Sequence, residues 1–295
     1  MRDAISLSQA LNARTIGLTV VAMVAFAANS VLCRLALAQG AIDPASFTLI
    51  RIGAGTVMLW LILAASGKPK AARGGWSAAL SLFTYAAAFS FAYVSLTAGA
   101  GALLLFGAVQ ATLVATGLVR GERPSRPQTL GFVLALAGLV ALLLPGASAP
   151  PLVGAALMIV AGVAWGAYSL LGRAAADPLA ATAGNFLRAL PLAALVAAAT
   201  ALHGWKIAPE GVIYAALSGA VASGLGYSIW YAALRGLSPV QAASVQLSVP
   251  VLAALAGTAT LGEAVSLRFA LSSIAILGGI ALVIAGRKRL TKRPR

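Results

Sequence analysis

Cysteine, histidine and acidic residues are scarce in this sequence, and each shortage excludes a class of function. A single cysteine, Cys33, leaves no partner for an intrachain disulfide. A single histidine, His203, cannot form a histidine cluster for zinc, so we expect no metal site. None of the six acidic residues lies in the middle of an apolar run. A proton-coupled exporter of cationic drugs, which would ordinarily use a buried carboxylate, is therefore disfavoured.

Sequence motifs of energy coupling and catalysis are absent as well. No Gly-x-x-x-x-Gly-Lys-Ser/Thr segment is present to bind ATP, and we expect no cofactor. An intramembrane protease would need a serine and histidine pair or two aspartates in the membrane, and His203 has no evident partner. We expect that the chain is not an enzyme.

Charged residues make up only 9% of the chain, whereas hydrophobic residues make up 61% and the mean hydropathy is +0.96. This composition leaves too little polar surface to cover a water-soluble globule of 295 residues. The sequence therefore indicates an integral membrane protein.

Ten apolar runs are long enough to cross a hydrocarbon core, which takes about 20 helical residues. They cover residues 15–38, 44–66, 76–97, 100–119, 128–145, 152–172, 179–202, 211–234, 239–261 and 267–286. The connections between them are short and carry proline, glycine and aspartate. We predict an all-α integral membrane protein with ten transmembrane helices.

Basic residues gather on one side of this predicted topology. With the N-terminus inside, most of the 21 Lys and Arg residues fall in inner segments, and Arg34, Lys206 and Arg268 are at outer ends. We therefore expect a bacterial-type inner membrane location with both termini cytoplasmic. The net charge of +15 is spread over separate inner loops, so we expect no nucleic-acid partner. The tail from Arg287 to Arg295 would contact anionic lipid heads or serve as a plain topology anchor.

The chain also repeats itself. Val21 to Arg34 aligns with Val160 to Arg173 at a shift of 139 residues, and Gly121-Glu122 aligns with Gly262-Glu263 at 141. We predict two repeats of five helices, in residues 1–147 and 148–295, the second ending in the basic cytoplasmic tail. Since five is odd, the second repeat would enter the membrane from the opposite side, which is the inverted architecture of many secondary transporters.

The sequence pattern of the second repeat resembles that of a known family. Leu234-Arg235-Gly236-Leu237-Ser238-Pro239, Pro250-Val251 and Gly262-Glu263 together resemble the EamA family of the drug/metabolite transporter (DMT) superfamily. Gly107-Ala108-Val109 departs from the pattern, because the second repeat has Ser248-Val249-Pro250 there. The likeness covers nearly the whole chain and is nearest to amino-acid exporters of the YddG type. It implies alternating-access export of small neutral metabolites, above all amino acids, aromatic ones included.

Other functions stay open at this point. Within transporters they are multidrug efflux and sugar-phosphate transport; outside them, a non-transporting lipid-binding scaffold. The expected partners are a small-molecule substrate and membrane lipids, and the oligomeric state is open, with a monomer plausible.

Candidate substrate-binding residues are the polar or aromatic side chains in the middle of spans. They are Asn29, Tyr85, Phe89, Phe106, Gln110, Trp165, Tyr168, Tyr227, Trp230, Ser244, Gln246 and Ser248. Aromatic members would form apolar walls, and the amides would bond the polar part of the substrate. Aromatic side chains in spans also serve helix packing, whereas an amide facing lipid would be unpaired.

Two arginines lie inside predicted spans, at a cost of about 2.5 to 3.5 kcal/mol on insertion scales. Arg51 and Arg188 must therefore be compensated. A substrate carboxylate is one partner, and helix-end carbonyls or snorkelling to the interface are the alternative.

Overall fold

The computed structural model describes residues 12–67, 73–121, 124–146, 149–172, 175–202, 204–237 and 239–290. Glu122, Arg123, Arg173, His203 and residues 291–295 lie outside this part of the chain, as do the side chains of residues 286–290. The predictions that concern those residues are not addressed by the structure.

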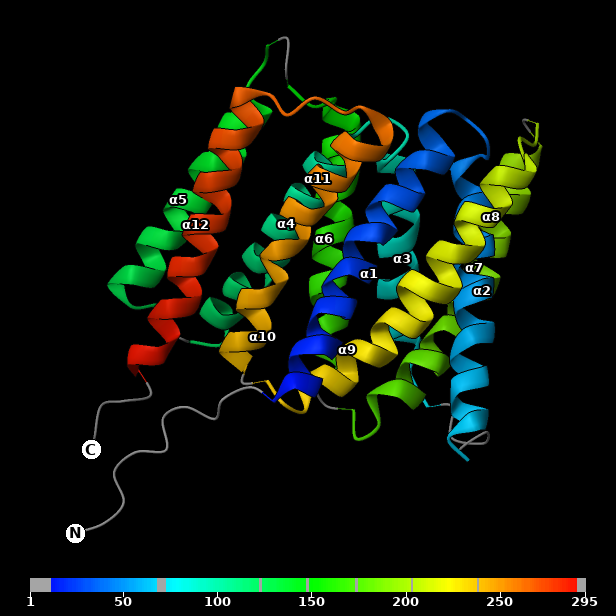
Figure 1. Cartoon of the computed structure of the whole chain (residues 1–295), viewed down its shortest axis with the longest axis horizontal. Helices are drawn as coiled ribbons and strands as arrows, with labels where there is room; N and C mark the ends of the chain where they lie inside the picture. Colours follow the sequence, from blue (N-terminus) through cyan, green and yellow to red (C-terminus); the bar gives the residue numbers. More distant parts are fainter. Residues whose placement is uncertain are drawn as a thin grey trace.

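The described chain is helical almost throughout (Figure 1). The helices of the first half are α1 (Ala13–Ala38), α2 (Pro44–Ala65), α3 (Trp76–Ala92), α4 (Ala98–Val119) and α5 (Arg126–Leu143). Those of the second half are α6 (Leu152–Gly172), α7 (Pro178–Ala201), α8 (Pro209–Leu217), η1 (Ser218–Leu225), α9 (Gly226–Leu234), α10 (Pro239–Gln246), α11 (Ser248–Leu261) and α12 (Leu267–Leu290). With α8, η1 and α9 taken as one crossing and α10 with α11 as another, each predicted span has its helix.

Helix starts follow local chemistry that the sequence displays. Asp43 precedes Pro44 and accepts hydrogen bonds from the backbone N–H groups of Ala45 and Ser46. Asp177 precedes Pro178 and accepts a hydrogen bond from the Ala180 N–H in the first turn of α7. A capping carboxylate satisfies N–H groups that a helix leaves unpaired, and proline at the first position loses none.

The main departure from the predicted spans concerns the third. Helix α3 ends at Ala92, although the apolar run continues to residue 97. Tyr93 is the C-cap of α3, and Thr97 is the N-cap of α4, where its hydroxyl accepts a hydrogen bond from the Ala100 N–H. The predicted break at residues 98–99 therefore lies a few residues too late, because most residues of the turn are apolar.

The third crossing of the second half contains a π-helical segment, η1. Gly219 faces α2 there, and a Cβ added to it would meet the Arg51 carbonyl oxygen at 2.1 Å. Only glycine allows α2 and η1 to approach this closely. π-Helical turns occur frequently at functional sites.

The outer surface of the bundle is apolar. In the described residues, nine helical segments are long and apolar enough to span a membrane, and the 17-residue α3 is a shorter apolar helix. Large hydrophobic side chains are exposed along α5 and α12, among them Leu130, Val133, Leu271 and Ile274. Such a surface fits hydrocarbon and not water, so the chain is a multi-pass membrane protein.

Packing between the two halves comes in matched pairs of helices. Helix α1 packs on α8, η1 and α9, and conversely α3 packs on α6. Helix α1 also packs on α11, and α6 on α4. Helices α2 and α7 pack together, and α5 and α12 form a pair at one edge of the bundle (Figure 1).

Candidate functional site

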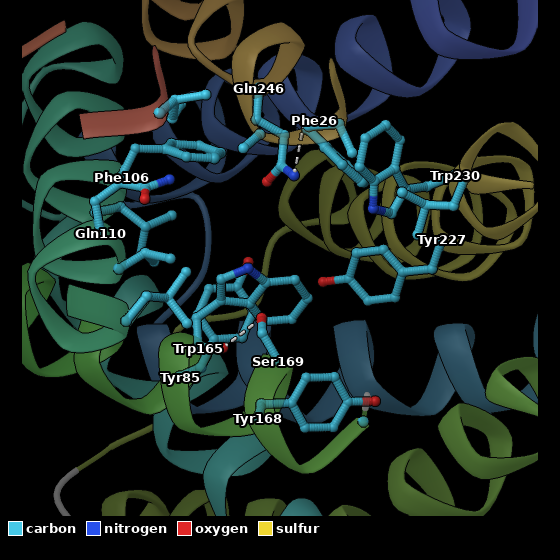
Figure 2. Close-up of a pocket in the computed structure, with 18 of the residues that line it drawn as sticks. Phe26, Tyr85, Phe106, Gln110, Trp165, Tyr168, Ser169, Tyr227, Trp230 and Gln246 are labelled. Carbon is cyan, nitrogen blue, oxygen red and sulfur yellow. Dashed lines mark hydrogen bonds between the residues drawn. The ribbon is translucent and has the colours of Figure 1, made fainter. Parts of the chain in front are cut away.

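A cavity of about 1220 Å³ lies between the two halves of the bundle. Ten of the twelve predicted site residues line it: Asn29, Tyr85, Phe89, Phe106, Gln110, Trp165, Tyr168, Tyr227, Trp230 and Gln246. They come from α1, α3, α4, α6, α9 and α10, so the topology brings together side chains that are far apart in the sequence (Figure 2).

Ser244 and Ser248 do not line the cavity, contrary to expectation. Both are exposed, and the Ser248 hydroxyl donates to the Val245 carbonyl oxygen at 2.7 Å. Each lies two residues from Gln246, and two residues rotate a helix by about 200°, so they face away from Gln246. Ser244, Gln246 and Ser248 therefore cannot all face the cavity from one helix.

Trp165 is the centre of the aromatic wall (Figure 2). Its ring stacks on Tyr168 at 5.3 Å between centroids and lies 4.7 Å from Tyr85 and 5.3 Å from Tyr227. Phe26 packs edge-on against Tyr227 and Trp230 from the other side. Four helices thus share one aromatic surface. Phe26 was not among the predicted residues, although it lies one turn before Asn29.

At the deep end of the cavity, the polar groups bond to one another. The Ser218 hydroxyl of η1 donates to Asn29 Oδ1 at 2.6 Å, and Asn29 Nδ2 donates to the Tyr85 hydroxyl at 3.5 Å. The Arg51 guanidinium donates to the same hydroxyl at 2.9 Å. Asn29 therefore has partner helices, as a buried amide requires.

A second polar cluster, on α7, was not predicted. The Thr182 hydroxyl lies 2.8 Å from the Tyr231 hydroxyl and accepts from Tyr168 at 3.3 Å. Asn185 Nδ2 donates to Tyr168 at 3.4 Å. Thr182 and Asn185 are three residues apart in an otherwise apolar run, a spacing that could have indicated one polar face.

The two glutamines differ in how far they are engaged. Gln246 Nε2 donates to the Ala242 carbonyl of its own helix at 3.3 Å, which leaves its carboxamide oxygen for other partners. Gln110 lines the cavity and makes no hydrogen bond to another described residue. The Gln110 amide and the Gln246 carboxamide oxygen are therefore available to a ligand.

The cavity extends to one end of the bundle only. Its lining continues through Leu118, Gln128, Gly172, Pro178 and Leu237, which lie at the end where α1 begins and α12 finishes (Figure 1). Toward the opposite end it stops near Ser30 and Phe89. The structure is thus open toward the end that holds the start of α1.

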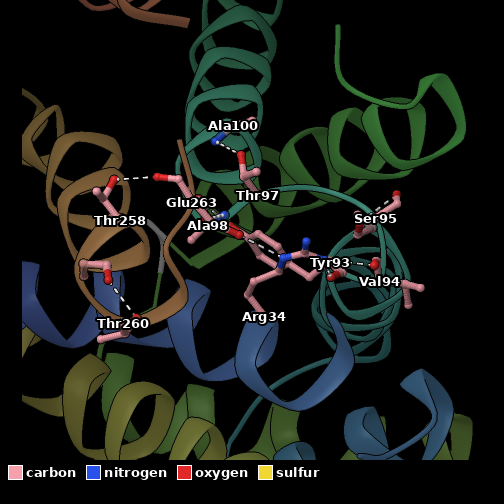
Figure 3. Close-up of polar contacts among 12 residues, drawn as sticks. Arg34, Tyr93, Val94, Ser95, Thr97, Ala98, Ala100, Thr258, Thr260 and Glu263 are labelled. Carbon is pink, nitrogen blue, oxygen red and sulfur yellow. Dashed lines mark hydrogen bonds and ion pairs between the residues drawn. The ribbon is translucent and has the colours of Figure 1, made fainter. Parts of the chain in front are cut away.

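An ion pair lies at the closed end (Figure 3). Arg34 Nε donates to Glu263 Oε1 at 3.0 Å, and Arg34 Nη1 donates to the carbonyls of Tyr93 and Val94 at 3.1 and 2.9 Å. Glu263 Oε2 accepts from the Ala98 N–H at 2.8 Å. We call these contacts the Arg34–Glu263 clamp, since they join the ends of α1, α3, α4 and α11.

The two intramembrane arginines have different partners. Arg188 Nη1 donates to the Gly184 carbonyl at 3.0 Å, in line with the helix-carbonyl alternative. Arg51 is 2% exposed, does not snorkel, and lies over the rings of Tyr85 and Phe89 at 5.2 and 4.9 Å from Cζ to centroid. Its position could not be inferred from depth alone, because the partners come from another helix.

The described residues that line the cavity include no charged side chain. No group of three or more histidine, cysteine, aspartate or glutamate residues is placed to hold a metal ion in the described part of the chain. The cavity offers aromatic faces, hydroxyls and amides, which suit an uncharged or zwitterionic small molecule.

Comparisons with known proteins agree with this architecture. The chain is 59% identical over 276 residues to an uncharacterized protein of Pseudomonas aeruginosa, covering 93% of this chain and 96% of the other. It is 36% identical over 180 residues to the threonine/homoserine exporter RhtA of Salmonella typhimurium, covering 58% of this chain and 57% of RhtA. A solved crystal structure that is 22% identical superposes with a TM-score of 0.64 over 94% of this chain and 99% of its own, which shows a shared fold.

The family model of EamA-like transporters matches two segments, residues 13–144 and 152–285. These segments together contain nearly every helix described above. The chain therefore belongs to the EamA-like transporter family.

Proposed function

We propose that this protein exports small neutral amino acids, aromatic ones included, across the bacterial inner membrane by alternating access. The observation that carries the proposal is the cavity, which is aromatic and amide-lined, uncharged among its described residues, and open at one end. The relative RhtA is a threonine/homoserine exporter, and this likeness supports the same substrate class.

Alternating access is supported by the paired packing of the two halves. Helix α1 corresponds to α6, and α3 corresponds to the crossing made of α8, η1 and α9. The contact of α1 with that crossing therefore has its counterpart in the contact of α6 with α3. Two separate matches to one family model also favour a duplicated unit. Such a molecule can invert its accessibility when each half adopts the conformation of the other.

The rival substrates differ in charge. A sugar phosphate needs basic side chains, and none lines the described part of the cavity. Apolar drugs fit the aromatic wall but make no use of the Gln110 amide or of the Gln246 carboxamide oxygen.

Purified protein in liposomes loaded with labelled threonine, homoserine, phenylalanine or tryptophan tests the proposal. We expect protein-dependent efflux of at least one amino acid and none of sugar phosphates or cationic dyes. A scaffold gives no flux, and efflux of dyes alone would replace amino-acid export by drug efflux.

Orientation has a test of its own. We propose that the open end faces the cytoplasm, because most basic loops lie at that end. A periplasmic reporter fused after Lys206 should be active and one fused after Arg123 inactive. Equal activity of the two fusions would refute the predicted topology.

A further inference from the structure

Arg51 is a buried cation without an anionic partner in the described part of the chain. The ion pair found there is that of the Arg34–Glu263 clamp, and Arg51 Nη1 is buried with no hydrogen-bond partner. The aromatic faces of Tyr85 and Phe89 attract the guanidinium but do not neutralise it. A charge so poorly compensated inside a membrane protein marks a functional position.

Arg51 lies just behind the cavity wall. It does not line the cavity, but Tyr85 and Phe89 do, and its guanidinium carbon is within 5.2 Å of both ring centroids. A single layer of side chains thus separates the positive charge from the cavity. In surroundings of low dielectric its field extends across that layer.

Tyr85 connects the charge to the cavity. Its hydroxyl oxygen accepts from Arg51 at 2.9 Å and from Asn29 at 3.5 Å, which occupies both lone pairs. The hydroxyl of Tyr227 interacts with that of Tyr85 and points toward this part of the cavity, so the two hydroxyls form one donor group there (Figure 2). The deep end is an array of hydroxyl donors polarised by a buried cation.

We infer that Tyr85, supported by Arg51, binds the carboxylate of the substrate. This inference rests on the proposed function and adds an orientation to it. The carboxylate lies at the Tyr85 end of the cavity, the side chain of the substrate contacts Trp165, and the carboxamide oxygens of Gln110 and Gln246 accept from the ammonium group. Selection is then for the carboxylate and not for the ammonium, since no described lining residue is acidic.

Ligand binding to the purified protein tests this assignment separately from transport. Thermal stabilisation is titrated with L-phenylalanine, L-phenylalaninamide, 2-phenylethylamine and 3-phenyllactate, and with threonine and its amide in parallel. A charge-assisted hydrogen bond predicts that at least one amino acid binds about tenfold or more tightly than its amide. Binding of 3-phenyllactate but not of the amino acids would assign the subsite to simple carboxylic acids.

Tyr85→Phe removes the donor and retains the ring. It should reduce the preference for acid over amide to within about threefold. The matched control is Tyr231→Phe, which removes a cavity hydroxyl bonded to Thr182 and should keep the preference. Arg51→Gln should also weaken the preference, and if it does not fold, Tyr85→Phe decides alone.

The outcomes separate the two proposals. If the protein binds the acids selectively but transports nothing, the proposal of export is wrong and the proposed carboxylate site stands. Flux with equal binding of acid and amide, or a preference that persists in Tyr85→Phe, would overturn the subsite and leave export. Failure of every probe to bind in an acid-selective way would also overturn the subsite.

Discussion

The Arg34–Glu263 clamp should hold one end of the cavity closed, and Glu263→Gln is the substitution that tests it. The clamp joins helices from both halves, so these contacts would have to break for that end to open. Glutamine keeps the size of the side chain and can still accept from the Ala98 N–H, but it loses the charge. The energetic effect is therefore confined largely to the pairing with Arg34.

The magnitude follows from the geometry of the pair. The two side chains are 18% and 11% exposed and the contact is 3.0 Å. Breaking a buried pair costs about 3 to 5 kcal/mol, whereas losing one charge-assisted hydrogen bond costs about 1.5 to 3 kcal/mol. Arg34 keeps its two carbonyl partners, so we expect about 1.5 to 2 kcal/mol, which is roughly a 10- to 30-fold shift toward the alternative state.

Cys33 provides the assay because it is the single cysteine of the chain and is fully buried. It lies four residues after Asn29, which places it on the cavity-facing side of α1 and one turn nearer the clamp. Opening at the clamp end should expose this thiol to water. The rate at which a membrane-impermeant maleimide labels Cys33 should therefore be about tenfold higher or more in Glu263→Gln than in the unmodified protein.

A matched control comes from the same end of the bundle. Arg268 donates to the Leu144 carbonyl, outside the clamp, so Arg268→Gln should leave Cys33 labelling unchanged. If folded Glu263→Gln is labelled within twofold of the unmodified protein, the clamp does not control this end.

Two further predictions concern the cavity and the packing behind it. Gln246→Leu should weaken amino-acid binding by about 1 to 3 kcal/mol, while its thermal stability stays near that of the unmodified protein. Ser248 is exposed, so Ser248→Ala should leave flux unchanged. If Gln246→Leu, Gln110→Leu and Trp165→Ala all fold and transport normally, these residues do not form the site. Gly219→Val should lower the thermal unfolding temperature markedly, because its side chain would meet backbone of α2, and an unchanged temperature would mean that η1 and α2 can separate.

Much of the helical framework could be predicted from the sequence, because apolar runs and their proline and aspartate punctuation are local properties. The position of the tight turn, which follows Ala92 and not residue 97, and the π-helical segment could not be predicted, since apolar residues continue through both. The candidate site divides in the same way. The sequence shows which polar and aromatic side chains lie in mid-span. It does not show which way Ser244 points, because that depends on how its helix is rotated, or where Arg51 lies, because its partner Tyr85 belongs to another helix.

The absence of charge from the described cavity lining has a consequence for energetics. Each elementary charge that crosses a membrane gains or loses about 2.3 kcal/mol per 100 mV, whereas a zwitterion carries none. Arg51 is fixed by Tyr85 and Phe89 in the wall and does not travel with a ligand. A zwitterionic amino acid that crosses without a co-transported ion would therefore carry no net charge, and the membrane voltage would neither drive nor oppose its passage.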